Sequence, residues 1–197
     1  MKTSQWNEIY NAVTGEIIRF ISRDAEADSV TFEYFSPAGS GKVIEHRHPG
    51  WEKFEVRSGT LTLTVNGQPH PLGPGEEFTI TSEWHFPANL GTEDVVAVVS
   101  ASPAALFERG LRELFGLYSD DGANRWDMPR DMLAVALLSE KGKFQAPGPP
   151  RWLWVSLMTG LGWVAVLAGK RRKLERYWPP ELERPWKARR AVAAARV

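Results

Sequence analysis

The chain has 197 residues, of which 43% are hydrophobic and 24% charged, a composition that indicates a folded globular protein rather than a disordered one. Cysteine is absent, which excludes disulfides, thiolate zinc sites, iron–sulfur clusters and cysteine nucleophiles and fits a reducing compartment. Residues 170–197 hold ten basic and three acidic residues, a net +7, and the other 14 basic and 21 acidic residues give −7 elsewhere. This split predicts a tail that contacts an anionic partner or pairs with the acidic body.

Residues 16–101 are predicted to form β-structure. Short runs rich in β-branched and aromatic residues alternate there with glycine-containing turns, and the predicted strands cover residues 17–21, 30–35, 60–65, 77–80 and 95–99. Asn66-Gly67 is a strong hairpin signal, because both positions of a tight primed turn need positive φ. No helix alternates with these strands, so we predict an antiparallel sandwich or barrel rather than a parallel α/β sheet.

The pattern becomes helical at Ser102-Pro103, where we expect Ser102 to cap a helix and Pro103 to be its first residue. Apolar residues at helical spacing predict helices over residues 104–118 and 129–140. The predicted fold is therefore mainly β with a C-terminal helical extension. Its predicted parts are a barrel (residues 1–102), a helical extension (103–150), and an apolar helix with a basic, tryptophan-rich tail (151–197).

Residues 152–169 contain no charge, and as a helix this run would be about 27 Å long at 1.5 Å per residue. Three alternatives are predicted for this helix. It packs on the barrel, on the preceding helices or across a homodimer interface; or it lies on a membrane surface, aided by the basic tail; or it spans the membrane. We expect no span, because no secretory signal is visible to export the barrel and Gly160 and Gly162 weaken the helix. The predicted location is the cytoplasm, with membrane association of residues 152–197 left open.

Four residues in the predicted barrel have the chemistry of a metal site. His46 and His48 are two apart, so on a strand their side chains leave the same face. Glu52 follows the Pro49-Gly50 turn, and His85 follows a later apolar strand. If the two hairpins pack together, three imidazoles and one carboxylate converge. Such a set suits Fe, Mn, Zn, Ni or Co with coordination positions left open.

These residues resemble the two motifs of the cupin superfamily, in particular its single-domain, RmlC-like conserved-barrel (type 2) proteins. The first family motif, G-x5-H-x-H-x3-4-E-x6-G, corresponds to the segment from Gly41 to Gly59, and the second, G-x5-P-x-G-x2-H-x3-N, to the segment from Gly75 to Asn89. Each segment is one residue short, and the second lacks the proline and glycine of the family. The resemblance implies an antiparallel double-stranded β-helix, or jelly-roll barrel, with a divalent metal held inside one end by four ligands: His46, His48, Glu52 and His85.

The resemblance also implies a small-molecule ligand or substrate inside the barrel. The candidates for its cavity wall are Tyr34, Phe54, Val56, Phe78 and Ile80. Oxygenation, isomerisation, cyclisation and decarboxylation are all compatible with an open divalent site. The alternative is a non-catalytic binding module attached to a membrane surface or an oligomer by its C-terminal region. His70, between Pro69 and Pro71, is predicted to be a solvated turn residue, and no specific nucleic-acid partner is predicted.

Overall fold

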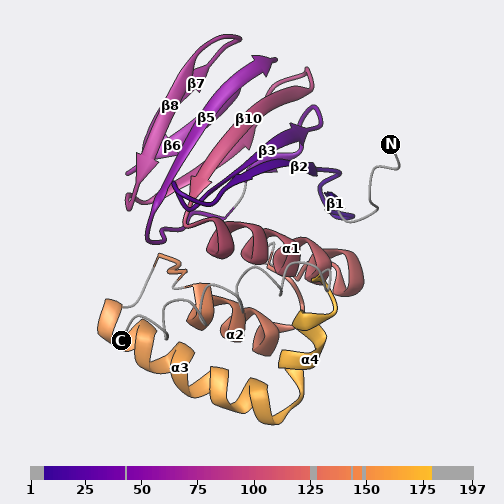
Figure 1. Ribbon diagram of the computed structural model, residues 1–197, viewed down its shortest axis with the longest axis vertical. Coiled ribbons are helices and arrows are strands. Elements are labelled where there is room, and N and C mark those ends of the chain that lie inside the picture. Colours follow the sequence, from indigo (N-terminus) through magenta and orange to yellow (C-terminus); the bar gives the residue numbers. More distant parts are fainter. Residues whose placement is uncertain (1–6, 43, 125–127, 143, 148–149, 179–197) are drawn as a thin grey trace.

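The computed structural model describes residues 7–178 apart from residues 43, 125–127, 143 and 148–149. Two antiparallel sheets enclose one core, and the helices lie together beyond one end of the barrel (Figure 1). This arrangement confirms the predicted mainly β barrel with a helical extension. The last residues of the basic tail, including Trp186, lie outside the described residues.

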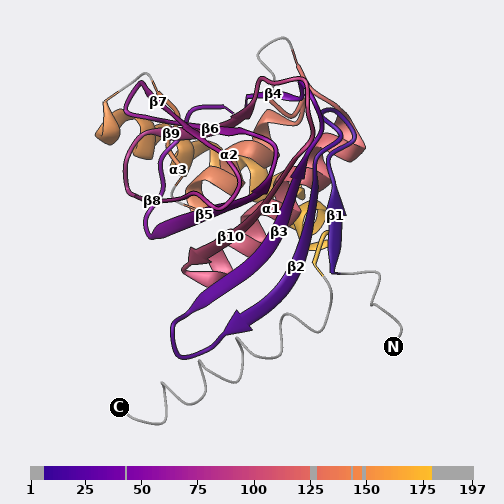
Figure 2. The ribbon, with the colours of Figure 1, turned by 90° about the horizontal axis from the view of Figure 1, so that it is seen from above.

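The larger sheet has six strands, and their spatial order is β1 (Glu8–Tyr10), β2 (Ile17–Asp24), β3 (Ser29–Ser36), β10 (Val95–Ser102), β5 (Trp51–Ser58) and β8 (Glu77–Thr81). The smaller sheet has four, in the order β4 (Gly41–Lys42), β9 (His85–Asn89), β6 (Leu61–Val65) and β7 (Gln68–Leu72). Seen from above, the two sheets face each other across the interior (Figure 2). Strict alternation in β3 and β10 sends every second side chain inward, as a half-buried strand requires.

The Asn66-Gly67 hairpin joins β6 and β7, and both residues have positive φ, 49° and 78°. His70 departs from its prediction, since it lies within β7 opposite Leu63 and its ring packs on Phe78 with 4.7 Å between ring centroids. Its two proline neighbours are tolerated because β7 is an edge strand, where no ladder hydrogen bond is lost.

In the part of the chain that the structure describes, four helices follow the barrel: α1 (Ala104–Asp121), α2 (Met132–Gly142), α3 (Arg151–Leu167) and α4 (Lys170–Glu175). The predicted start of the first helix is wrong by one residue, because Ser102 ends β10 and Pro103 is the cap. The second helix, α2, begins three residues later than predicted, directly after Asp131. Asp131 Oδ1 accepts the N–H of Ala134 at 3.1 Å and so caps this helix.

The helices form successive layers, with α1 next to the barrel, α2 beyond it and α3 outermost (Figure 1). One hydrophobic cluster fills the barrel and ends at Phe115 of α1, and a second joins the four helices from Leu117 to Leu174. The division of the chain at residues 102 and 150 stays a prediction.

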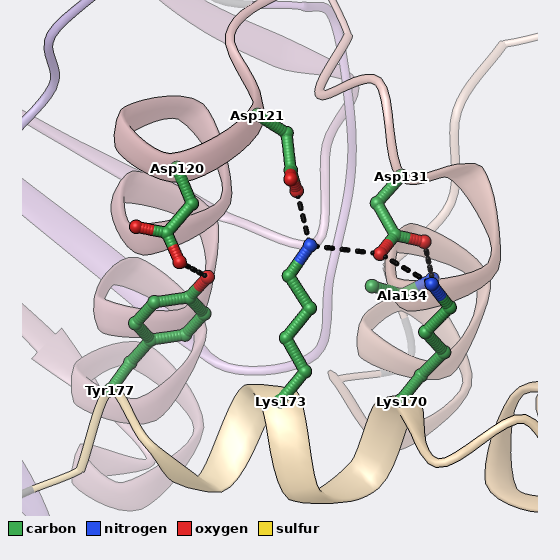
Figure 3. Close-up of polar contacts among 7 residues, drawn as sticks. All are labelled: Asp120, Asp121, Asp131, Ala134, Lys170, Lys173 and Tyr177. Atoms are coloured by element: carbon green, nitrogen blue, oxygen red, sulfur yellow. Dashed lines mark hydrogen bonds and ion pairs between the residues drawn. The ribbon is translucent and has the colours of Figure 1, made fainter.

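Helix α4 is held on α1 and α2 by ion pairs, and Tyr177, which follows α4, donates its hydroxyl to Asp120 Oδ2 at 2.8 Å (Figure 3). Lys173 Nζ lies 2.5 Å from Asp121 Oδ2 and 2.9 Å from Asp131 Oδ2, and Lys170 Nζ lies 2.9 Å from the same Asp131 oxygen. The Tyr177 ring lies over Gly116 so closely that a Cβ there would be 2.3 Å from the ring. This part of the basic tail therefore pairs with the acidic body, one of the two predicted alternatives.

Helix α3 packs on α2 through Gly162 and Ala165, which are buried. Its opposite side carries exposed apolar residues, including Trp152 at 71% and Trp163 at 70% exposure. Among the described residues, no helix combines the length and the apolar character needed to cross a membrane. The packing on α2 agrees with the packed-helix alternative for one side of α3 and leaves the other side uncovered.

Candidate metal centre

Two backbone pairings bring the predicted histidines together. His46 and His85 exchange backbone hydrogen bonds of 3.0 and 2.9 Å, which ties the segment after β4 to the start of β9. Arg47 pairs in the same way with Gln145 of the helical extension, at 3.1 and 3.0 Å. The His46–His48 segment is thus held by isolated bridges and does not form a regular strand. The alternation of side chains still applies, so His46 and His48 face the same side.

The turn between His48 and Glu52 depends on Gly50. Gly50 has φ +100°, and a Cβ there would lie 1.8 Å from the carbonyl oxygen of Ser102. No other residue fits this combination of positive φ and close backbone approach. The turn returns the chain into β5, where Glu52 faces inward opposite Ile80 of β8.

His46, His48 and His85 form one cluster whose candidate ligand atoms lie within 4.8 Å of one another. Each ring turns its Nδ1 to a backbone carbonyl: Ile44 O at 2.7 Å for His46, Pro49 O at 3.3 Å for His48 and Glu83 O at 2.8 Å for His85. A carbonyl only accepts hydrogen bonds, so each Nδ1 carries the proton and each Nε2 presents a lone pair. Hydrogen bonds from the ring N–H to a backbone carbonyl are the contacts that orient metal-binding histidines.

Glu52 lies beside the cluster. Its carboxylate oxygens are 3.8 Å from His48 Nε2 and 3.4 Å from His85 Nε2. Burial by itself raises the pKa of Glu52, but the neighbouring imidazoles outweigh it and the net pKa is lowered. Burial likewise lowers the pKa of His85, and the Glu52 carboxylate more than reverses this, so the net pKa is raised.

His46 and His48 are neutral at neutral pH. Burial and the charge of His85 lower the pKa of His46 to about 4. Burial is also the main cause of the lowered pKa of His48. Two neutral imidazoles, a third imidazole and an ionised carboxylate match the donor set of a borderline divalent metal.

The fit to a metal is supported by two buried nitrogen atoms. The Nε2 atoms of His48 and His85 are shielded from solvent, and apart from the Glu52 carboxylate at 3.8 and 3.4 Å they have no hydrogen-bond partner among the described residues. A buried polar atom without a partner costs about 1–3 kcal/mol, and a bound metal ion would remove this cost. The three histidines could therefore hold an ion, and Glu52 is placed to be a fourth ligand.

The helical extension contributes residues to the centre that the sequence analysis did not identify. Phe107 of α1 meets the His48 ring edge-on at 4.7 Å between centroids, and Phe144 lies 5.2 Å from the His46 ring. Trp154 of α3 donates its indole N–H to Phe144 O at 3.1 Å. No motif spacing signals these residues, because they reach the site only through the packing of the helices.

The predicted cavity residues divide into two groups. Tyr34 and Phe54 line a cavity of about 250 Å³ that His46 and Glu52 also border. Val56 and Ile80 are buried in the barrel core, and Phe78 packs against that core and against His70; these three are not among the residues that line this cavity. Tyr34 donates a hydrogen bond to Glu16, which occupies its hydroxyl.

Comparison with known proteins places the barrel in a family. A sequence profile described as a cupin domain matches residues 32–101. A comparison with curated proteins finds no match. Many solved structures are similar. An RmlC-like cupin from Shewanella frigidimarina is 17% identical, with 51% of this chain and 87% of that chain covered and a TM-score of 0.44.

Two further solved structures are similar over the same part of the chain. A protein with a double-stranded β-helix domain from Klebsiella pneumoniae is 24% identical, with coverage of 45% of this chain and 77% of that one and a TM-score of 0.40. The cupin domain of an XRE family transcriptional regulator from Enterobacter cloacae is 17% identical, with coverage of 44% and 94% and a TM-score of 0.39. The two antiparallel sheets and the three convergent histidines agree with the profile match over β3–β10, so the barrel at residues 32–101 is a domain of the cupin type.

Proposed function

We propose that the chain is a metal-binding cupin that binds or transforms a small molecule in the cavity beside His46 and Glu52. The observation that carries this proposal is the shared arrangement of the three histidines, whose Nδ1 atoms face carbonyls and whose candidate ligand atoms lie within 4.8 Å of one another. His46, His48, Glu52 and His85 are the proposed ligands to Fe, Mn, Zn, Ni or Co.

A divalent ion held by four protein ligands keeps open positions for a ligand molecule and polarises its oxygen atoms. Dioxygenase, isomerase, cyclase and decarboxylase reactions are all compatible with such a site. The chain's own contribution is a shielded pocket: Phe107 and Phe144 cover the imidazoles on the helical side, and Tyr34 and Phe54 border the cavity on the barrel side. Such a shielded, low-dielectric pocket strengthens every charge interaction with the bound molecule.

The proposal is tested by elemental analysis of protein purified without chelators and then loaded with each of the five metals. We expect about one ion per chain in the wild type and a loss of that ion in the double variant His46→Ala, His48→Ala. His70→Ala is the matched control, because His70 is the one histidine outside the cluster, and it should keep full occupancy. Full occupancy in the double variant, or no ion in the wild type under any loading condition, would contradict the proposal.

A second candidate is a non-catalytic binding cupin attached to a membrane surface through residues 152–197, and the outer side of α3 favours it. Eight large apolar residues of this helix are exposed. The exposed Arg171, Arg172 and Arg176 follow directly, so apolar and cationic groups lie next to each other, as at an anionic lipid surface. The same apolar side of α3 could instead form a homodimer interface, and vesicle sedimentation combined with analytical ultracentrifugation distinguishes a membrane surface from a second copy of the chain.

A further inference from the structure

The cavity beside the candidate metal centre extends out of the barrel and under the helices. On the barrel side it is lined by residues such as Phe32, Tyr34 and Phe54, and on the other side by residues of α1, α2 and α3. Met158 and Leu161 of α3 face it from the outermost layer. The helical extension therefore completes the walls of a binding site, in addition to packing against the barrel.

The chemistry of the walls changes from one end of the cavity to the other. His46 and Glu52 mark the polar end, beside the metal centre. Toward the helices the walls are mainly phenylalanine, leucine, valine and methionine side chains, Leu111 and Leu114 from α1 among them, and the polar lining residues there are Tyr118, Ser139 and Gln145. Methionine is flexible and polarisable and adapts to apolar molecules of different shape. Met132 borders the cavity and is about half exposed, which places an opening to solvent at the start of α2.

The residues that line the cavity exclude one large class of ligand. None of the described lining residues is a lysine or an arginine. Phosphate groups are recognised by arginine, lysine or helix N-termini, so a sugar phosphate or nucleotide would find no counter-charge along these walls. The charged lining residues are the glutamates Glu16, Glu45 and Glu52, so an anionic group would need a metal ion at the histidine cluster as its counter-charge.

We infer that the natural ligand is a small amphipathic molecule, with an oxygen head group at the metal and an unbranched or aromatic apolar body between the barrel and α1, α2 and α3. This inference rests on the proposed function for the head group and on the apolar walls for the body. A cavity of about 250 Å³ holds on the order of ten non-hydrogen atoms, at about 30 Å³ for each water-sized group. That is the size of a medium-chain carboxylate.

The test measures the affinity of the metal-loaded full chain for octanoate and for butyrate by isothermal titration calorimetry. Each buried methylene group should raise the affinity about fourfold, the equivalent of about 0.8 kcal/mol. Octanoate has four more methylenes than butyrate, so it should bind on the order of a hundredfold more tightly. The same titrations on chelator-treated protein measure how much of the affinity comes from the metal.

Two variants on α3 show whether the chain-length effect arises in this cavity. Met158→Gln puts a polar group into the apolar wall and should weaken octanoate about tenfold while leaving butyrate affinity and metal content unchanged. Thr159→Gln is the matched control, because the neighbouring Thr159 faces solvent on the outer side of α3, and it should bind both acids like the wild type.

The results separate this inference from the proposed function. Equal affinity for both acids, or an equal effect of the two variants, would overturn the inference even if the metal is bound. Chain-length dependence that Met158→Gln removes, in a protein that takes up no metal, would uphold the apolar site and refute both the head-group contact and the metal-dependent function. A stoichiometric metal with no chain-length effect would leave the proposed function standing alone.

Discussion

The three histidines of the cluster are oriented by their backbone surroundings. Because Nδ1 of each ring donates to a carbonyl, protonation would have to occur at Nε2, inside a buried space that already contains other imidazoles. Burial lowers the pKa of both His46 and His48, which keeps their Nε2 lone pairs free at neutral pH. The Glu52 carboxylate supplies the negative charge that a divalent ion needs. At neutral pH the site therefore combines the neutral imidazoles of His46 and His48 with the ionised carboxylate of Glu52.

Asn89, the last residue of the second motif, has a structural role that its place in the motif does not reveal. It is buried at the end of β9, and its side-chain N–H groups donate to Ser36 O, Pro37 O and Glu93 O at 3.0, 2.9 and 3.0 Å. Its Oδ1 accepts the N–H of Gly91 at 3.1 Å. The side chain therefore joins the segment after β3 to the segment after β9.

We predict that Asn89→Ala lowers the free energy of unfolding by about 1–3 kcal/mol, because buried carbonyl groups lose their donors. Asn89→Asp should be at least as damaging, since it places carboxylate oxygens against three carbonyls. Denaturant unfolding followed by circular dichroism measures both effects. The metal content of either folded variant should match the wild type; a variant of full stability that has lost its metal would show instead that Asn89 acts on the site.

That the four candidate residues lie close together could be predicted from the sequence, but their surroundings could not. His46, His48, Glu52 and His85 follow a spacing that strand alternation and a hairpin turn can convert into proximity. Phe107 and Phe144 reach the same rings from a different layer, and Gln145 fixes Arg47 by a backbone pairing across nearly 100 residues of chain. Such contacts depend on how the helices pack on the barrel, and local periodicity contains no information about that packing.

At the scale of elements, Asp131 connects three helices. Its Oδ1 caps α2, and its Oδ2 pairs with Lys170 and Lys173 of α4, while Lys173 also reaches Asp121 at the end of α1 (Figure 3). Burial by itself raises the pKa of Asp131, but the hydrogen bonds from Lys170 and Lys173 outweigh it and the net pKa lies below the ordinary 3.8. The ion pairs fix the short helix α4, which could not be stable alone.

We predict that Asp131→Asn weakens the attachment of α4 and lowers the free energy of unfolding at pH 7 by about 0.5–1 kcal/mol, while asparagine still caps α2. Because the folded pKa of Asp131 is lowered, its contribution is present above the unfolded pKa and disappears as the pH falls through the folded one. The difference between wild type and variant should therefore shrink below about pH 4, in denaturant titrations at several pH values. Glu140→Gln, an exposed change on α2, is the control, and a difference that stays constant down to pH 2 would contradict the ion-pair account.

Sequence periodicity was sufficient to locate the predicted strands and helices, but not to show how the chain turns between them. Every predicted strand is present, and so are the three predicted helices. The apolar run over residues 152–169 ends as α3 at Leu167, because Gly169 adopts φ +73° and starts a new direction for α4. The sequence could not show that the basic residues after this glycine would fold back onto acids of α1 and α2, since that contact depends on the tertiary arrangement.

For the whole molecule, α3 has two different sides. Its inner side reaches the cavity through Trp154, Met158 and Leu161, and its outer side presents the exposed Trp152 and Trp163. The helix is the outermost layer of the extension (Figure 1). Apart from Arg151, it has no charged residue that would favour solvation of the outer side. An uncovered apolar surface of this kind indicates a partner surface.

We predict that this side attaches peripherally to anionic bilayers, because apolar burial by the tryptophans and attraction of Arg171, Arg172 and Arg176 act together, at about 1 kcal/mol for each basic group near the surface. The full chain should sediment with vesicles containing one quarter phosphatidylglycerol at low salt and leave them at 1 M salt, where the Debye length falls to about 3 Å. The double variant Trp152→Gln, Trp163→Gln should lose binding, whereas Tyr10→Gln, an exposed aromatic change on the first strand, should retain it.

Protein that stays in the pellet at low salt, high salt and alkaline carbonate would mean insertion rather than surface attachment. Protein that stays in the supernatant throughout, and sediments as a dimer in analytical ultracentrifugation only while both tryptophans are present, would assign the outer side of α3 to a second copy of the chain.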